Sequence, residues 1–415
     1  MDINPIILAI PIYFILIGIE VVYDWVKKKN IYRLNDALTN ISCGMFEQIT
    51  GVFVKVATIA IYHYFFTQFA LFEIPQTWYW AVLLFVLVDF FYYWAHRLDH
   101  EVNILWLGHS VHHQSEDYNF SVALRQGAFQ KIFNVVFMLP LAIIGFETEW
   151  FLYVGAFGTL YQFWIHTEAV DKLPGWFEFV FNTPSHHRVH HGRNPKYIDR
   201  NHGGTFIIFD RIFGTFQKEE ERPTYGVTTP TATFDPVNAH IKPWKALWGQ
   251  LVSVTGVKNK LKLLVMPPGW MPDSLGGRVQ PTEVNKPTYK KFSLDIPRQW
   301  NYYIFFQYAL ILTGAAFFLF NFKQFEWRDS ILFASLLVIS LVSIGRIFEQ
   351  KTWAFWLEMA RLLIVPLILL SLYTFERYLQ ISLLMGSLLS LVWVIINFKN
   401  TVEIKTLSSK RETTK

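Results

Sequence analysis

The sequence predicts an all-α fold, a polytopic bundle of about nine membrane helices with a histidine-rich cap on the cytoplasmic side. Three observations lead to this prediction. Hydrophobic residues make up 52% of the 415 residues and charged residues only 17%, whereas a soluble domain carries about 25% charged residues. Apolar stretches of membrane-spanning length recur along the chain. Between them, most of the histidines gather in three short clusters.

The expected helices follow from the apolar stretches, each near the ~20 residues that cross the hydrocarbon core of a bilayer. They cover residues 4–24, 43–65, 77–97, 128–146, 149–167, 300–320, 330–346, 353–373 and 379–397. The fourth, fifth and seventh are short or interrupted, so they are candidates for re-entrant or bundle-interior helices. The first has no preceding basic region and no small-residue cleavage site, which favours a retained helix over a signal peptide.

Lysine and arginine residues predict the orientation. The loop after the first span contains Lys27–Lys29 and Arg33, whereas the loops at 66–76 and 145–149 contain neither residue type. The positive-inside rule places the first loop in the cytoplasm and the N-terminus outside. Counting the spans from the N-terminus then places three segments in the cytoplasm: His96–Gln126, Thr167–Gln299 and the basic tail Lys399–Lys415. The first two contain all three histidine clusters, so we expect a multi-pass membrane protein with its active site on the cytoplasmic side.

Charge and cysteine content exclude other classes. The net charge of +5 is the excess expected beside membrane spans and indicates no nucleic-acid partner. Cys43 is the single cysteine, so the chain has no intrachain disulfide and no cysteine-rich metal site.

We divide the chain into three parts by hydropathy. Residues 1–214 form the histidine-bearing membrane core, 215–298 an irregular cytoplasmic segment, and 299–415 the C-terminal transmembrane helices and basic tail. The middle segment is rich in Pro and Gly, with a candidate amphipathic helix near 236–254. The last part adds no histidine; packing, lipid access and dimerisation are its open roles, and the oligomeric state is not predicted.

The histidine clusters are the strongest functional signal. Eight of the thirteen histidines have helical spacing: His96 and His100; His109, His112 and His113; His187, His190 and His191. Positions three or four apart share a helix face, so their imidazoles can converge. A lone histidine on an apolar face is more often a satisfied core residue, but three clusters, two with the same HxxHH spacing, favour metal ligands. Eight imidazoles exceed one tetrahedral ion, so two metals are the simplest count.

Local signals position the clusters. The first pair should emerge on the cytoplasmic extension of the third span. Thr183 can cap a helix that has Pro184 as its first residue, which puts the third cluster on the opening turns. Asn194 and Pro195 then mark the exit from that helix.

The runs HRLDHEVNILWLGHSVHHQSEDYN, WIHTEAVD and NTPSHHRVHHGRNPKYIDRNHGGTFIIFDRIFGTF resemble the fatty acid hydroxylase and sterol desaturase superfamily. Within it they are most similar to the alkylglycerol monooxygenase branch. The resemblance implies that the eight clustered histidines hold a non-haem di-iron centre. His166 stands where relatives carry a further histidine pair, whose second position is Val170 here. We expect His166 to be a ninth ligand; the alternative is a bundle-interior histidine that hydrogen-bonds nearby.

Other residues near the clusters receive secondary roles. Glu101 matches a glutamate of the monooxygenase branch and is the expected catalytic residue; the alternative is a solvated interfacial charge. Asp99, Glu116 and Asp117 are candidates to orient the ligands. We also expect His186 to support the ligands from outside, and Tyr118 and Asn119 to shape an oxygen or cofactor pocket. Arg188 and Arg193 are expected to face lipid phosphates, a reduced cofactor or only the cytoplasm. The histidines expected to be structural are His63, His202 and His240.

The ligand type and the membrane location predict the chemistry. An all-nitrogen site fits iron that activates dioxygen, and a membrane enzyme can reach the unreactive C–H bond of a lipid. The resemblance implies hydroxylation of the carbon next to the ether oxygen of an alkylglycerol, and the resulting hemiacetal collapses to a fatty aldehyde and a glycerol derivative. It also implies two iron ions, dioxygen as co-substrate and tetrahydrobiopterin as a candidate donor. Since no dinucleotide fingerprint, flavin or cytochrome segment is present, the electron donor is external; no cofactor-binding residue is assigned.

Two other functions remain open. One is a hydroxylase or desaturase of the same superfamily acting on a sterol, a fatty acyl chain or a carotenoid. The other is a metal transporter or a sensor with a histidine-lined site; a transporter would place its ligands along a path near the membrane midplane. The histidines instead cluster beyond the helix ends on one side.

Overall fold

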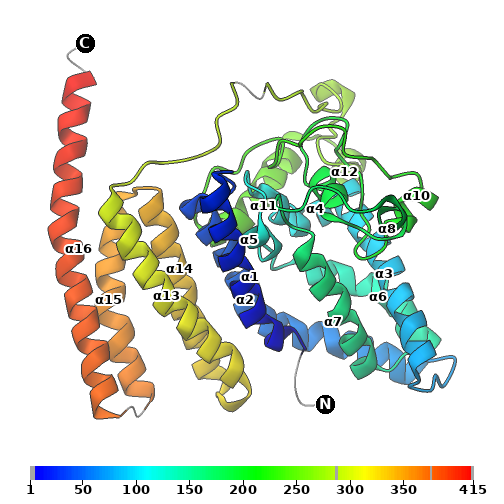
Figure 1. Ribbon diagram of the computed structural model, residues 1–415, viewed down its shortest axis with the longest axis horizontal. Helices are drawn as coiled ribbons and strands as arrows, with labels where there is room; N and C mark the ends of the chain where they lie inside the picture. Colours follow the sequence, from blue (N-terminus) through cyan, green and yellow to red (C-terminus); the bar gives the residue numbers. More distant parts are fainter. Residues whose placement is uncertain (1–4, 286–287, 374–375, 413–415) are drawn as a thin grey trace. The chain divides into compact units, whose positions relative to one another are not determined.

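The computed structural model describes residues 5–285, 288–373 and 376–412, and within these ranges the protein is helical. Two isolated bridges, Phe181 with Phe206 and Gly192 with Tyr225, are the only β-type pairings there. The predicted all-α class is confirmed (Figure 1). Residue 4 of the first expected span and residues 413–415 of the expected tail lie outside the described residues.

The chain forms two compact units. The first comprises Met1–Ala232 and Asn238–Phe292, and the second Thr233–Val237 and Ser293–Lys415. Seven of the described helices are long and apolar enough to cross a membrane. Three of them belong to the first unit: α1 (Pro5–Lys27), α2 (Leu34–Phe69) and α3 (Trp78–Glu101).

Two of the nine expected spans are shorter helices, α6 (Gln130–Ile144, 15 residues) and α7 (Thr148–Trp164, 17 residues). The α6–α7 hairpin nevertheless reaches the turn between α2 and α3, where the Leu71 amide donates to the Ile143 carbonyl at 2.8 Å. Gly145 closes the hairpin with a φ of +119°, and a Cβ at this position would lie 1.9 Å from the Phe72 carbonyl oxygen. The turn therefore requires glycine.

Helix α2 has 36 residues, and its polar first turns and its apolar later turns lie in different environments. Its first turns bury polar side chains, among them Asn40, whose amide donates to Asp36, Ser115 and Ser121. Its later turns are apolar. The expected span at 43–65 is shorter than the helix because hydropathy predicts a loop for the polar residues at its beginning. In the structure these residues are helical, and their side chains pair with polar groups of the cap.

Short helices build the cap of the first unit: α4 (Asn103–His109), η1 (His112–Gln114), α5 (Phe120–Ala123), α8 (Gly175–Val180), α9 (Pro184–His190), α10 (Ile208–Ile212), α11 (Pro236–Ser253), α12 (Val257–Val265) and η2 (Asp273–Leu275). Figure 1 shows them gathered at the end of the unit where α3 finishes and α2 begins. Asp89 of α3 connects this helix to the cap, because its carboxylate accepts hydrogen bonds from the backbone amides of Thr205 and Phe206. Helix α11 covers the stretch where an amphipathic helix is expected.

The second unit contains α13 (Arg298–Asn321), η3 (Phe322–Gln324), α14 (Trp327–Phe348), α15 (Thr352–Leu372) and α16 (Arg377–Glu412). A buried polar network joins the four long helices. Glu358 and Arg361 of α15 form an ion pair at 2.6 Å, Ser343 of α14 donates to Glu358, and Gln307 of α13 bonds both Arg361 and Ser390 of α16. Since a lone charge among apolar helices is costly, this pairing specifies how the helices pack.

Candidate metal centre

Nine buried histidines converge in the cap of the first unit. Within each of two groups, one ligand atom of every residue lies within 4.8 Å of the others. The first group contains His96, His100, His109, His113 and His190; the second contains His112, His166, His187 and His191. The structure thus brings together all nine histidines that the sequence singles out.

Each HxxHH motif divides its histidines between the two groups. His109 and His113, four positions apart, belong to the first group, while His112 belongs to the second. In α9 the pattern is reversed, because His187 and His191 join the second group and His190 the first. The last two histidines of each motif are adjacent in sequence, so their side chains leave the backbone in different directions. One motif can therefore contribute to two centres at once.

The Nε2 atoms within a group face one another at short range. His109 Nε2 lies 3.0 Å from His96 Nε2 and 2.9 Å from His113 Nε2. In the second group, His187 Nε2 lies 2.9 Å from His166 Nε2 and 3.2 Å from His191 Nε2. Two nitrogens bound to one ion at about 2.1 Å and roughly at right angles are about 3.0 Å apart. The observed spacing fits a shared ion.

Backbone carbonyls orient several of the rings. The Nδ1 atom of His112 lies 2.7 Å from the Arg125 carbonyl oxygen, and that of His166 lies 2.7 Å from the Gln162 carbonyl oxygen. An Nδ1–H that donates to a carbonyl leaves Nε2 with its lone pair, the form that binds a metal. Both Nε2 atoms point into the second group.

Burial keeps the cap histidines uncharged. It lowers the pKa of His112 to about 4 and holds the pKa values of His109, His113, His166, His187, His190 and His191 well below the usual range. Neutral imidazole is the ligating form. Within the described residues, the buried Nε2 atoms of His100 and His190 have no hydrogen-bond partner. A metal ion in the first group would satisfy both, so these residues fit a metal centre.

Comparison with known proteins supports an enzymatic site. A family model described as fatty acid hydroxylase matches residues 81–215. Alkylglycerol monooxygenase from Xenopus tropicalis is 39% identical over 359 residues, covering 85% of this chain and 79% of the relative. Alkylglycerol monooxygenase from Homo sapiens is 37% identical over 409 residues, covering 97% and 90%. The chain belongs to the alkylglycerol monooxygenase family.

Membership of the alkylglycerol monooxygenase family makes this chain an oxygen-dependent oxidoreductase, and the family resemblance seen in the sequence is confirmed. An ornithine lipid hydroxylase from Rhizobium tropici is 31% identical over 146 residues, covering 34% of this chain and 44% of the relative. No solved structure matches the chain. The fatty acid hydroxylase match contains all nine histidines.

In this member of the alkylglycerol monooxygenase family, one loop supports three histidines of the first group. The loop comprises residues 199–205. Its His202 carbonyl oxygen lies 2.7 Å from His96 Nδ1, and its Arg200 carbonyl oxygen lies 3.0 Å from His190 Nδ1. The carboxylate of Asp199 is 3.6 Å from His100 Nδ1. The second group has other supports, so the two groups are oriented by separate parts of the chain.

Asn201 fixes the shape of the 199–205 loop. It is fully buried and has a φ of +57°, a conformation that asparagine tolerates better than most residues. Its side-chain amide donates to the carbonyls of His186 and Gln217 at 3.0 and 2.8 Å and accepts from the Gln217 amide at 2.8 Å. Asp210 adds two contacts by accepting from the backbone amides of His202 and Gly203.

The sequence reasoning missed this loop and treated His202 as structural. The His202 ring lies 5.2 Å from His100, centroid to centroid, and neither ring nitrogen makes a hydrogen bond within the described residues. The available signal was the Gly203–Gly204 pair. A Cβ at Gly203 would lie 2.5 Å from the Phe206 carbonyl oxygen, and one at Gly204 would lie 2.7 Å from Asp89. Two adjacent glycines thus mark a close approach of backbone to its surroundings.

The carboxylates singled out by sequence have partners outside the two groups. Glu101 accepts from Arg97 Nε at 2.9 Å, and its side chain is 33% exposed. Asp99 accepts from the amides of Gln130 and Asn134. Two further carboxylates tie a distant segment to the cap: Glu116 bonds Tyr289 and the Phe292 amide, and Asp117 bonds Lys291 and Arg33. Asp199 instead lies beside an imidazole of the first group, 3.6 Å from His100 Nδ1.

The two residues after these carboxylates differ in position. The Tyr118 ring lies 5.8 Å from His166 and 5.2 Å from His191, and it stacks on Tyr225 at 4.9 Å. It therefore covers the second group. Asn119 caps α5 by accepting from the Ser121 amide at 3.0 Å, which is a structural role.

Arg188 is fully buried and braces the second group from behind. It donates twice to Glu219, at 2.9 and 2.8 Å, and to the carbonyls of Thr167, Val170 and Asp171. Its donors are therefore directed inward and are not available to lipid phosphates. Arg193 donates to the Thr228 carbonyl and to Tyr289.

The remaining predicted positions make contacts outside the two groups. Pro184 begins α9 as expected, but the Thr183 hydroxyl donates to Glu178 instead of capping the helix. His186 lies away from the two groups, with its ring against Phe216. His63 pairs with Thr148, and His240 lies 3.3 Å from the Gln126 carbonyl oxygen.

Proposed function

We propose that this protein is a di-iron monooxygenase that hydroxylates the carbon next to the ether oxygen of an alkylglycerol. One oxygen atom enters the C–H bond and the other leaves as water, with two electrons and two protons from the donor. The hemiacetal product collapses to a fatty aldehyde and a glycerol derivative. The observation that carries this proposal is the convergence of nine buried, neutral imidazoles in a chain related along most of its length to alkylglycerol monooxygenases.

In this proposal the five histidines of the first group hold one iron and the four of the second group hold the other. When bound, the irons supply the activation of dioxygen that oxidises the C–H bond. The second group has fewer nitrogens, so it leaves more room for dioxygen or substrate. The backbone carbonyls of Arg125 and His202 orient the imidazoles of His112 and His96. The Tyr118 ring covers the second group and excludes water from it.

The electrons come from a reduced donor outside the chain, and tetrahydrobiopterin is the donor that family membership suggests. We assign no residue to it. The lipid substrate reaches the cap from the membrane in which the spans lie, as expected for an insoluble substrate.

We place the site on the cytoplasmic side. Helix α1 ends at Lys27, and the basic loop that follows joins the cap, where Arg33 Nε bonds the Asp117 carboxylate at 2.8 Å. The basic loop and the histidines thus belong to the same end of the first unit. By the positive-inside rule, this end faces the cytoplasm.

Anaerobic reconstitution with ferrous iron in detergent tests the function. We expect two irons per chain and, after oxygen is added, fatty aldehyde from an alkylglycerol only when reduced pterin is present. Sterol and fatty acyl substrates, offered under the same conditions, measure the alternative in this superfamily. A hydroxylated sterol without aldehyde would overturn the substrate assignment, whereas bound metal without oxygen consumption would favour transport.

Glu101 keeps its predicted catalytic role as a proposal. We expect Glu101→Gln to retain most of the iron but to lose at least ~10-fold in turnover, the low end of what a positioned acid or base supplies. Iron content and turnover measured on the same preparation separate the possibilities. Normal turnover would make Glu101 only the partner of Arg97, and Arg97→Gln is the control that breaks the same ion pair without removing the carboxylate.

A further inference from the structure

Helices α11 and α12 lie in an unusually basic part of the cap. From residue 236 to 272 the chain has five lysines, three tryptophans and no acidic residue. Lys242 bonds the carbonyls of Thr231 and Ala232. Lys245, Lys258, Lys260 and Lys262 are exposed, and no salt bridge involves them within the described residues. The segment therefore presents uncompensated positive charge.

Helix α12 exposes an apolar stripe beside these lysines. Val257 is 74% exposed, and Leu261 and Val265 follow at intervals of four residues, so the three side chains form one line along the helix. Leu263, on another face, is fully buried against the cap. Lys258 and Lys262 border the stripe. A helix with an apolar face flanked by lysines is typical of one that lies in the interfacial plane of a bilayer.

Helix α11 repeats the arrangement. Ile241, Trp248 and Val252, at spacings of seven and four, form an exposed stripe, and Trp248 is 69% exposed. The opposite face carries Leu247, which is buried in a small core with Leu263. Tryptophan is enriched at the level of lipid headgroups. Two consecutive helices thus bury one face on the cap and leave an apolar, basic face free.

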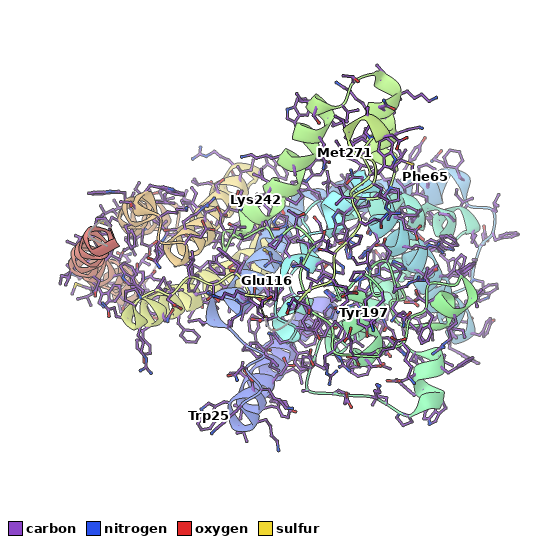
Figure 2. All side chains as sticks on the ribbon, turned by 90° about the horizontal axis from the view of Figure 1, so that it is seen from above. Trp25, Phe65, Glu116, Tyr197, Lys242 and Met271 are labelled. Atoms are coloured by element: carbon purple, nitrogen blue, oxygen red, sulfur yellow. The ribbon has the colours of Figure 1, made fainter. Side chains whose placement is uncertain are left out.

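This helix pair is attached where a membrane span ends. Asn103 begins α4, two residues after the last residue of α3. Its side-chain amide donates to the Leu263 carbonyl at 3.0 Å, and its backbone amide donates to the Met266 carbonyl at 3.1 Å. The end of α12 is therefore held at the level at which α3 leaves the bilayer. Figure 2 shows the segment between Lys242 and Met271 projecting past the rest of the first unit.

We propose that α11 and α12 form a membrane-surface site that binds the anionic headgroups of the leaflet on the side of the histidine cap. The exposed stripes insert among the headgroups and upper acyl chains, and the four exposed lysines contact the phosphates. Charge complementarity selects this occupant, because a basic segment without acidic residues attracts an anionic lipid surface. A protein partner or a second copy of the chain is the competing occupant.

A depth measurement tests the proposal on the full chain in lipid nanodiscs. Cys43 is the only cysteine and is fully buried, so a thiol-reactive fluorophore at Leu261→Cys reports on α12. Lys218→Cys, an exposed cap position, is the matched control. The nanodiscs contain phosphatidylcholine alone or with about one-third phosphatidylserine. Phospholipid with a shallow spin label and water-soluble iodide serve as the two quenchers.

We expect the spin-labelled lipid to quench the fluorophore at position 261 at least about threefold more than that at 218, and more strongly with phosphatidylserine. Replacing Lys258, Lys260 and Lys262 together by glutamine should abolish the phosphatidylserine effect while retaining the bound iron, which shows that the variant is folded. Quenching at 261 by iodide alone would overturn the proposal. Shielding from both quenchers, together with a dimeric mass, would assign the surface to a second copy instead.

Discussion

His190→Ala is expected to abolish turnover and to lower the iron content from two per chain toward one. The imidazole of His190 belongs to the five-histidine group. Its Nε2 has no hydrogen-bond partner within the described residues, and its Nδ1 faces the Arg200 carbonyl. No other side chain can replace a buried nitrogen aimed at the ion. Iron analysis and aldehyde release, measured on the same purified sample, check the expectation.

His240→Ala is the matched control, because His240 is equally buried but lies outside both groups. It should retain the iron and most of the activity. His191→Ala removes a ligand from the other group and should also abolish turnover. Similar activity in the three proteins would contradict the assigned ligand set.

Asn201→Gly is expected to weaken iron binding by the first group, although Asn201 contacts no ion. Glycine tolerates the left-handed backbone, so the substitution removes only the three side-chain hydrogen bonds to His186 and Gln217. The 199–205 loop then orients His96, His100 and His190 less well. Loss of such an outer support typically lowers metal affinity by about 10–100-fold. At limiting iron, the content should fall toward one per chain, and the magnetic coupling between the ions should disappear.

Asn30→Gly is the control for the Asn201 experiment, since Asn30 has a φ of +55° but is exposed and, within the described residues, hydrogen-bonds only to the Lys28 carbonyl. It should keep both irons. Asn201→Asp retains the acceptor for the Gln217 amide and should fall between glycine and the natural residue. Equal loss of the two irons would contradict the separate orientation of the groups.

Spacing alone predicted that the histidines meet, because helical periodicity is a property of the local sequence. It did not predict how each HxxHH motif divides its ligands. That division depends on contacts between η1 and α9, which are distant in sequence, such as the 4.4 Å approach of the His113 and His191 rings. His112 joins the second group through the short η1 turn after α4, a local departure from the regular helix that the spacing suggested.

The groups that orient the histidine rings could not be predicted from the sequence for a different reason. The groups that orient His96, His112 and His190 are backbone carbonyls, and every residue type has one. Only Asp199 has a side chain that sequence could have singled out. Glu101 drew attention because it adjoins a ligand in sequence, yet in the helix it is turned toward Arg97.

Helix lengths were also predicted incompletely. The turn between α6 and α7 is formed by Gly145, Phe146 and Glu147. The apolar Phe146 extends the expected fourth span past the end of α6, whereas the expected fifth span extends past the other end of α7, at Trp164. The opposite error occurs in α2, where polar residues at 35–42 end the apolar stretch but not the helix.

The short α6 has a consequence for the surrounding lipid. Fifteen residues rise about 22 Å, several ångströms less than the roughly 30 Å of an average hydrocarbon core. Lys131 marks one end, where it pairs with Glu47, and Glu147 lies just past the other, beyond the turn of the hairpin. If α6 crosses the bilayer, the bilayer beside it has to become thinner, or the polar ends of the helix have to extend outward. In that case the hydrophobic mismatch draws the headgroup layer inward beside α6 and shortens the distance that a lipid has to rise to reach the histidines.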